Sequence, residues 1–282
     1  MSALDVVLED LAFPEGPRWR DGRLWVSDMH GHEVLALDPD GRRETIVRVP
    51  NRPSGLGWLP DGRLLVVSMT DRRVLRLEPG GLVEHADLST LATWDCNDMV
   101  VDDAGRAYVG NFGSDYDVAA KRLPALTSLV RVDPDGMATV EARDLSFPNG
   151  AVITPDGRTL VVAETFGRRL TAWDRRPDGS LANRRVWADL GRVWPDGICL
   201  DAEGAVWVAD PPGHELLRVA EGGDVLARVA TGDRMPVACM LGDEDRRTLY
   251  VCTALKTGPR TAEERAGRIE AVRVPVAGAG AP

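Results

Sequence analysis

The stretch FPEGPRWRDGRLWVSD, residues 13–28, contains the pattern that decides the fold. It opens with a turn, continues as a short apolar segment, reverses at Asp21-Gly22 and ends in a second apolar segment. An Asp-Gly pair supplies the positive φ that a tight β-hairpin needs. The pattern returns five more times, as RPSGLGWLPDGRLLVVSM from Arg52, CNDMVVDDAGRAYVGNF from Cys96, FPNGAVITPDGRTLVVAE from Phe147, WPDGICLDAEGAVWVAD from Trp194 and MPVACMLGDEDRRTLYVCT from Met235.

The spacing of these six repeats indicates the architecture. Equivalent positions follow one another at intervals of 39, 44, 51, 47 and 41 residues, at Gly16, Gly55, Met99, Gly150, Gly197 and Ala238. A period of about 40–50 residues with several strands per unit is typical of a propeller blade. No repeat shows the 3.6-residue apolar stripe of a helical solenoid. We therefore predict an all-β fold, a six-bladed β-propeller of four-stranded antiparallel blades, forming one domain over residues 1–282.

The first repeat predicts the four strands of a blade, at residues 17–20, 24–28, 33–38 and 44–49. The two ends of the chain are expected to meet in the last blade. There, residues 268–276 supply a C-terminal strand and residues 3–11 add an N-terminal one. Such a closure removes free strand edges, which otherwise promote aggregation.

Composition excludes several classes of partner. The chain has 34 Lys and Arg against 44 Asp and Glu, a net charge of −10, which argues against nucleic acid and an anionic membrane surface and favours a bound cation. No apolar run approaches the ~18 residues of a membrane span, and the N-terminus lacks the basic region of a secretory signal. The four cysteines are widely spaced, which predicts buried, reduced thiols and a cytoplasmic location: Cys96, Cys199, Cys239 and Cys252.

Oxygen-bearing side chains precede the first strand of most repeats. The equivalent residues are Glu15, Ser54, Asp98, Asn149, Asp196 and Val237, with Asn97 one position earlier in the third repeat. In a propeller these positions converge near the axis. Carboxylate and amide oxygens suit hard cations such as Ca²⁺, Mg²⁺ or Mn²⁺. The alternative is that Asp and Asn only cap turns, but Glu is a poor turn residue.

A set of motifs carries a family resemblance over residues 13–274. The motifs are FPEG (13–16), PSGLG (53–57), ND (97–98), GNFG (110–113), FPNG (147–150), ETFGRRL (164–170) and PDG (195–197). With them the chain resembles the gluconolactonase, regucalcin (senescence marker protein) and luciferin-regenerating enzyme family. That resemblance implies that Glu15, Asn149 and Asp196 bind one divalent metal, with Ca²⁺ expected first and Zn²⁺, Mn²⁺ or Mg²⁺ as alternatives. It also implies that Asn97 is a further ligand or a substrate contact, and that Asp196 is the general base.

One position departs from the family pattern. Lactonases of the family often hold the sugar with an Arg two residues before the Asn of the ND motif, and this chain has Asp95 there. The departure argues against gluconolactone, and aldonolactones generally, as the preferred substrate. Asp95, Asp98 and Asn97 are the expected substrate contacts in this region.

Residues after the second strand of each repeat are expected to line the same face. These are Asp28, Thr70, Asn111, Glu164 and Asp210. Asn111 is predicted to contact substrate, and so is Tyr116. Tyr116 lies in the segment 113–124, for which we predict a partial lid with Tyr116, Lys121 or Arg122 reaching the substrate; a solvated loop is the alternative. His30 and His32 form a possible but isolated metal-binding pair.

The functional interpretation is a divalent-metal-dependent hydrolase that opens a lactone, either a sugar lactone or a related small lactone. A bound metal polarises the carbonyl and stabilises the oxyanion, and a carboxylate activates the attacking water. The partner is then a small molecule, and no pattern in the sequence indicates an oligomeric state. Two alternatives stay open: a non-catalytic propeller that binds calcium or a protein, and a phosphotriesterase-like hydrolase at the same metal.

Overall fold

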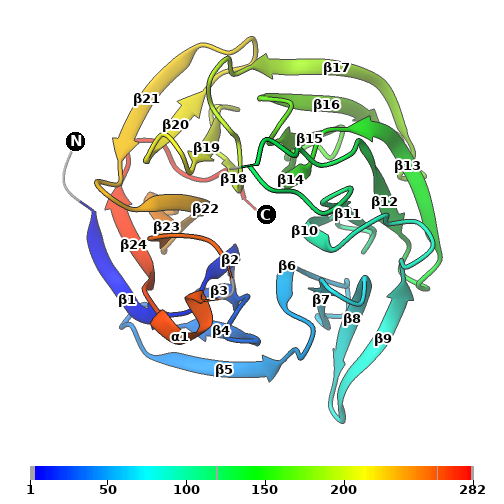
Figure 1. The fold of residues 1–282 in the computed structure, drawn as a ribbon, viewed down its shortest axis with the longest axis horizontal. Coiled ribbons are helices and arrows are strands. Elements are labelled where there is room, and N and C mark those ends of the chain that lie inside the picture. The colour runs from blue at the N-terminus through cyan, green and yellow to red at the C-terminus, as the bar shows by residue number, and fades with distance from the viewer. Residues whose placement is uncertain (1–3, 119, 259, 281–282) are drawn as a thin grey trace.

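Six four-stranded antiparallel sheets surround a central axis in the computed structural model, which describes residues 4–118, 120–258 and 260–280 (Figure 1). The predicted all-β, six-bladed propeller is confirmed. The first three sheets consist of β2 (Pro14–Arg20), β3 (Arg23–Asp28), β4 (Glu33–Leu37) and β5 (Arg43–Arg48); β6 (Pro53–Trp58), β7 (Leu64–Ser68), β8 (Arg73–Glu78) and β9 (Gly81–Asp87); and β10 (Cys96–Val101), β11 (Ala107–Asn111), β12 (Thr127–Val132) and β13 (Ala138–Leu145).

The remaining sheets follow the same plan, and α1 (Thr261–Glu264) is the single short helix of the described residues. They consist of β14 (Pro148–Ile153), β15 (Thr159–Glu164), β16 (Arg169–Arg175) and β17 (Leu181–Asp189); β18 (Ile198–Leu200), β19 (Val206–Asp210), β20 (Glu215–Val219) and β21 (Val225–Ala230); and β22 (Met235–Gly242), β23 (Thr248–Ala254), β24 (Gly267–Arg273) and β1 (Asp5–Leu11).

The ring closes as the sequence predicts. β1 pairs antiparallel with β24 at the outside of the sixth sheet, with Asp5 opposite Ala271 and Leu11 opposite Gly267. The two ends of the chain therefore share one sheet. Both strands are slightly shorter than predicted, and the first strand of the first repeat begins three residues earlier, at Pro14.

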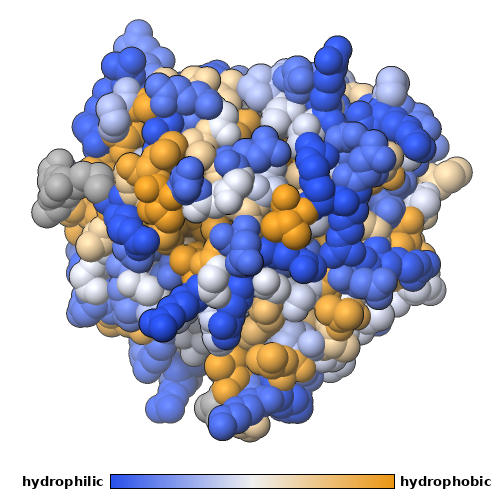
Figure 2. Space-filling view, turned by 90° about the horizontal axis from the view of Figure 1, so that it is seen from above, coloured by the Kyte–Doolittle hydropathy of each residue, from blue (hydrophilic) through white to orange (hydrophobic). Residues whose placement is uncertain are grey.

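Burial follows the position of a strand in its sheet. Each sheet faces a neighbour on both sides, so a strand near the axis is covered on both faces and reads as a continuous apolar run. β7, LLVVS, is buried at every position, whereas the outer strand β9 leaves Val83 40% exposed. The edge of the disc accordingly mixes hydrophilic and hydrophobic side chains (Figure 2).

Glycine after the site-facing turn lets the innermost strands approach closely. A Cβ on Gly55 would lie 2.2 Å from the backbone nitrogen of Met99, in the next sheet. A Cβ on Gly150 would lie 2.5 Å from the backbone nitrogen of Ile198, again in the next sheet. Real side chains do not tolerate such distances, so these glycines set the tight packing around the axis.

Carboxylates at the ends of second strands fasten the turns that lead into the sheets. Asp28 accepts hydrogen bonds from the backbone nitrogens of Ala12 (3.0 Å) and Phe13 (2.7 Å). Asp210 accepts one from Trp194 (3.0 Å), and Glu164 accepts one from Ser146 (2.8 Å). These acids were expected to line the functional face, but they serve to hold the backbone that carries it.

The cysteines and the helix content agree with the sequence. All four cysteines are buried and free, and the sulfur atoms of Cys199 and Cys239 lie 3.6 Å apart without a bond. None of the helical segments in the described ranges has the length and apolar character required to cross a bilayer.

Candidate active site

A cavity of about 700 Å³ opens on the face where the innermost strands begin. Its lining includes Glu15 at the start of β2, Asn97 at the start of β10, Asn149 at the start of β14 and Asp196 just before β18. Four of the predicted site residues, each from a different sheet, therefore meet in one place. Val237, the equivalent residue of the sixth sheet, completes this part of the wall.

Hydrogen bonds orient the two amides. Asn97 donates its Nδ2 to the carbonyl of Pro148 at 3.5 Å, and Asn149 donates its Nδ2 to Thr165 Oγ1 at 3.3 Å. Thr165 in turn donates to the carbonyl of Pro195, 2.8 Å away and next to Asp196. Within the part of the chain that the structure describes, the Oδ1 atoms of Asn97 and Asn149 accept no hydrogen bond.

Two carboxylates share this buried region and perturb each other. Burial raises the pKa of Glu15 well above its usual value, and the charges of Asp196 and Asp98 add to the rise. Burial also raises the pKa of Asp196 to about 8, a contact with Asn149 opposes the rise, and the charge of Asp98 reinforces it. The charge of Arg18 lowers the pKa of Glu15, but burial outweighs it.

The donor set fits a hard cation. Among the described residues, no three His, Cys, Asp or Glu side chains cluster as metal ligands, so a metal here depends on the two amides as well as the two acids. Carboxylate and amide oxygens without nitrogen or sulfur are the ligands of Ca²⁺, Mg²⁺ or Mn²⁺. A divalent ion would also neutralise Glu15 and Asp196. We call Glu15, Asn97, Asn149 and Asp196 the oxygen cluster.

The structure does not bring two other predicted residues to the cavity. Asp98 points to Arg18, whose Nη2 lies 2.8 Å from Asp98 Oδ1, and it also accepts from the backbone of Met99. The amide of Asn111 is engaged by Thr127 (2.5 Å), Gly113 (3.1 Å) and the carbonyl of Ser128 (2.9 Å). Both side chains are buried in local networks, which the sequence pattern could not distinguish from exposure to a substrate.

One side of the cavity is polar. Asp95 lines it as predicted, and His30 and Arg52 stand with it although neither was predicted to bind substrate. Burial and the nearby charges of Arg52 and His32 lower the pKa of His30 to about 4, so its ring is neutral. His32 instead bonds the carbonyl of Pro50 through Nδ1 (2.7 Å). Among the described residues, the two histidines belong to no cluster of three His, Cys, Asp or Glu side chains.

Part of the cavity lining is aromatic, and sequence reasoning missed most of it. Phe112 and Phe147 stack with centroids 4.5 Å apart, and Tyr116 packs edge-on against both, at 5.9 and 5.3 Å. All three line the cavity. The repeats did carry a signal for part of the lining. In three repeats the residue directly before the turn proline lines the cavity; these residues are Phe13, Arg52 and Phe147.

The segment 113–124 covers part of this opening. Tyr116, Asp117, Val118 and Arg122 line the cavity, so the predicted position of the segment over the site agrees with the structure. Backbone pairing of Asp117 with Arg122 closes the segment on itself. Thr257 and Gly258, between β23 and β24, add to the rim from the sixth sheet.

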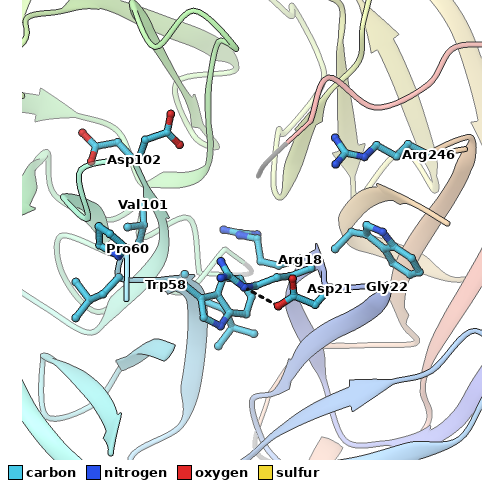
Figure 3. Close-up of a pocket in the computed structure, with 14 residues that line it drawn as sticks. Arg18, Asp21, Gly22, Trp58, Pro60, Val101, Asp102 and Arg246 are labelled. Atoms are coloured by element: carbon cyan, nitrogen blue, oxygen red, sulfur yellow. Dashed lines mark hydrogen bonds and ion pairs between the residues drawn. The ribbon is translucent and has the colours of Figure 1, made fainter. Parts of the chain in front are cut away.

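A second cavity of about 560 Å³ lies at the opposite end of the innermost strands (Figure 3). It is framed by the turns after the first strands, with Asp21, Pro60 and Asp102, and by Arg246. Arg20 stands over the ring of Trp58 at 4.8 Å and pairs with Asp21 at 3.1 Å. No member of the oxygen cluster reaches this cavity, so the candidate chemistry belongs to the other face.

These features define a class: a six-bladed propeller whose axial cavity has a floor of carboxylate and amide oxygens from four sheets. The sequence model of the SMP-30/Gluconolactonase/LRE-like region matches residues 13–255, and the chain belongs to this family. That membership agrees with the resemblance carried by the repeat motifs.

Individual relatives span almost the whole chain. A 6-deoxy-6-sulfogluconolactonase of Pseudomonas putida is 28% identical, covering 98% of this chain and 96% of its own length. A pentonolactonase of Haloferax volcanii is 28% identical over 94% of this chain and 89% of its own. Among solved structures, a calcium-binding protein, regucalcin, from Agrobacterium tumefaciens superposes with a TM-score of 0.81 at 24% identity, covering 100% of this chain and 96% of that one.

Proposed function

We propose that this protein is a divalent-metal-dependent lactonase that opens a sugar lactone or a related small lactone. The observation that carries the proposal is the convergence of Glu15, Asn97, Asn149 and Asp196 on one cavity. Relatives that are lactonases over nearly the full length of the chain support the same reaction. A propeller that serves only as a scaffold has no need of such a cluster at its axis.

Glu15, Asn149 and Asp196 would hold the ion, with Asn97 beside it as a further ligand or a substrate contact. A divalent ion bound there would polarise the lactone carbonyl and stabilise the oxyanion. Ca²⁺ is the first ion to test, because the donor set is all oxygen and a calcium-binding regucalcin shares the fold. Zn²⁺, Mn²⁺ and Mg²⁺ are the alternatives.

Asp196 acts as the general base. It removes a proton from the water that attacks the lactone carbonyl, and it returns that proton to the ring oxygen when the carbon–oxygen bond breaks. The product is the open hydroxy acid. Asn149 and Thr165 position Asp196 through the chain of hydrogen bonds that ends at Pro195. Burial in the cavity keeps this carboxylate poorly solvated, which suits a group that exchanges protons with substrate.

The experiment is a pH-indicator assay over a lactone panel, after chelation and after addition of each divalent ion. We expect hydroxy acid release that disappears on chelation and returns with metal. Asp196→Asn should lose at least about 100-fold in kcat, the size of a general-base contribution. Asp103→Asn, an exposed acid on the opposite face, is the matched control and should retain full activity.

Two results would overturn the proposal. Stoichiometric metal binding without turnover of any lactone indicates the non-catalytic calcium-binding propeller. Hydrolysis of phosphotriesters but no lactones indicates the phosphotriesterase-like alternative at the same metal.

A further inference from the structure

The aromatic side of the cavity is a continuous surface, not a single ring. Phe112 and Phe147 stack almost parallel, with 11° between their planes. Phe166 packs edge-on against Phe147 at 5.2 Å and contacts Tyr116 at 5.8 Å, and Trp194 contacts Phe166 at 5.2 Å. Rings that are buttressed from behind keep their orientation, so Phe112, Tyr116 and Phe147 present a fixed apolar wall to the cavity.

Phe147 and the equivalent residue of the second repeat, Arg52, share an uncommon backbone conformation. Phe147 has φ of 61°, in the left-handed region that bulky residues rarely adopt. Strained non-glycine residues of this kind concentrate at functional sites, where the surrounding structure holds them. Here the result is a side chain that is only 5% exposed and that contributes to the cavity wall.

The apolar character continues to the mouth of the cavity. Tyr116 and Val118 line it and are 36% and 44% exposed. Leu123 and Leu126, on the same connection between β11 and β12, are 57% and 60% exposed. Tyr116 and Val118 are large side chains left partly open at the cavity itself, which indicates a site that receives an apolar group.

Polar groups beyond the oxygen cluster also line the cavity, at His30, Arg52, Asp95, Asp117 and Arg122. A polyhydroxylated lactone carries hydroxyls around its whole ring. In this cavity some of those hydroxyls would face Phe112 and Phe147 and lose their hydrogen bonds to water without replacement. Unpaired polar groups of this kind reduce binding strongly.

We propose, on the basis of the lactonase function above, that the substrate is a lactone bearing an aromatic or alkyl substituent. The substituent packs on the wall of Phe112, Tyr116 and Phe147, while the lactone carbonyl faces the oxygen cluster. Phe112 and Val118 are then residues that determine specificity without taking part in the reaction.

The test compares three six-membered lactones with the metal-loaded enzyme: δ-valerolactone, its 4-phenyl derivative and D-glucono-1,5-lactone. In the first two the ring oxygen leaves as a primary alkoxide, so their ratio reports on the substituent. We expect kcat/KM for the phenyl lactone to exceed that for δ-valerolactone by about tenfold or more, the effect of filling an apolar pocket. Glucono-1,5-lactone should be the poorest of the three.

Variants then locate the effect. Phe112→Ser and Val118→Ser should each lower kcat/KM for the phenyl lactone more than for δ-valerolactone, and the ratio of the two should fall by about tenfold in Phe112→Ser. Val83→Ser is the matched control, because Val83 is 40% exposed but lies on the outer strand β9. Calorimetric binding of the phenyl-substituted hydroxy acid, compared with gluconate, gives a readout that does not depend on turnover.

The outcomes separate this inference from the proposed function. Preference for glucono-1,5-lactone, or an equal effect of Phe112→Ser on all three lactones, overturns the apolar substrate and leaves the lactonase proposal standing. No metal-dependent turnover of any lactone overturns both.

Discussion

Arg18 and Asp98 form a buried ion pair that joins the first sheet to the third. Arg18 Nη2 lies 2.8 Å from Asp98 Oδ1 and 2.6 Å from the carbonyl of Met99, and Nη1 donates to the carbonyl of Pro17 at 2.8 Å. β2 and β10 belong to sheets that are not neighbours in the ring, so the pair reaches past the second sheet near the axis. It gives Asp98 a counter-charge and keeps it out of the cavity.

Arg18→Met should therefore destabilise the protein by about 3–5 kcal/mol, because removing one partner leaves an uncompensated buried charge. Urea unfolding of the metal-free protein measures this. The double variant Arg18→Met with Asp98→Leu should recover part of the loss. Arg122→Met, which breaks an exposed pair with Asp115, should change the unfolding free energy by less than about 1 kcal/mol. Equal effects of the buried and exposed pairs would contradict the interpretation.

The raised pKa of Asp196 predicts how stability changes with pH in the absence of metal. Between the unfolded pKa near 4 and the folded pKa of about 8, the folded protein holds a proton that the unfolded chain releases. Stability should therefore fall as pH rises through this window. Urea unfolding with chelator at pH 5 and pH 8 measures the slope.

Asp196→Asn provides the comparison for that slope. The substitution removes the contribution of Asp196 to the pH dependence of stability. The contribution of His30 remains, and it acts in the opposite direction because the pKa of His30 is lowered. The unfolding free energy of the variant, minus that of the wild type, should be larger at pH 8 than at pH 5. Added divalent metal should stabilise the wild type more at pH 8 than at pH 5, since binding requires deprotonated ligands. A wild-type curve parallel to that of Asp196→Asn would refute the assignment.

Asp28→Ala tests the carboxylates that fasten the leading turns. The substitution leaves two backbone N–H groups, of Ala12 and Phe13, without their acceptor. Each buried unsatisfied group costs about 1–3 kcal/mol, so we expect a loss of about 2–6 kcal/mol in unfolding free energy. Asp103→Ala, at an exposed turn position that is not among the residues with positive φ, is the control. An unchanged melting temperature for Asp28→Ala would show that the turn is stable without the carboxylate of Asp28.

Gly150→Ala tests the close approach of the innermost strands. The added Cβ would meet backbone atoms of the next sheet, which cannot move as a flexible side chain could. Overpacking of this kind destabilises by about 1–3 kcal/mol. Gly80→Ala is the matched control, because nothing lies within 4 Å of a Cβ at Gly80. Thermal unfolding of the two variants measures the difference.

Shortening the segment 113–124 tests whether it acts as a lid. Replacement of residues 115–122 by a short glycine linker removes Tyr116, Val118 and Arg122 from the cavity. We expect KM to rise by about tenfold with a smaller change in kcat, because the lining is lost while the oxygen cluster stays intact. Kinetics identical to those of the wild type would favour the solvated loop instead.

Much of the fold was predictable because its determinants are local. Each hairpin is encoded by a turn such as Asp21-Gly22 between two apolar segments, and six similar units leave few ways to bury their faces. Closure through β1 and β24 followed from the unpaired strand at each end. That residues 1–282 form one domain stays a prediction.

The site was predictable only where the repeats place side chains at equivalent positions. Glu15, Asn149 and Asp196 meet as predicted, whereas Asp98 turns away because Arg18 offers a charge partner. Asn111 is taken up by its own neighbours, and the wall of Phe112, Tyr116 and Phe147 arises from segments of two different sheets. Such contacts depend on side-chain packing between repeats, which sequence spacing does not specify. The metal, its ligands and the lactone remain predictions for experiment.

The pairing of β1 with β24 also fixes the order of events when the chain is made. β1 leaves the ribosome before β24, because its partner is synthesised some 260 residues later. At about 5–20 residues per second, β1 waits about 13–50 s without its sheet. Five sheets can assemble during that delay, while the sixth is completed only once β24 has emerged. The nascent protein thus carries β1 as an unpaired strand until β24 is made.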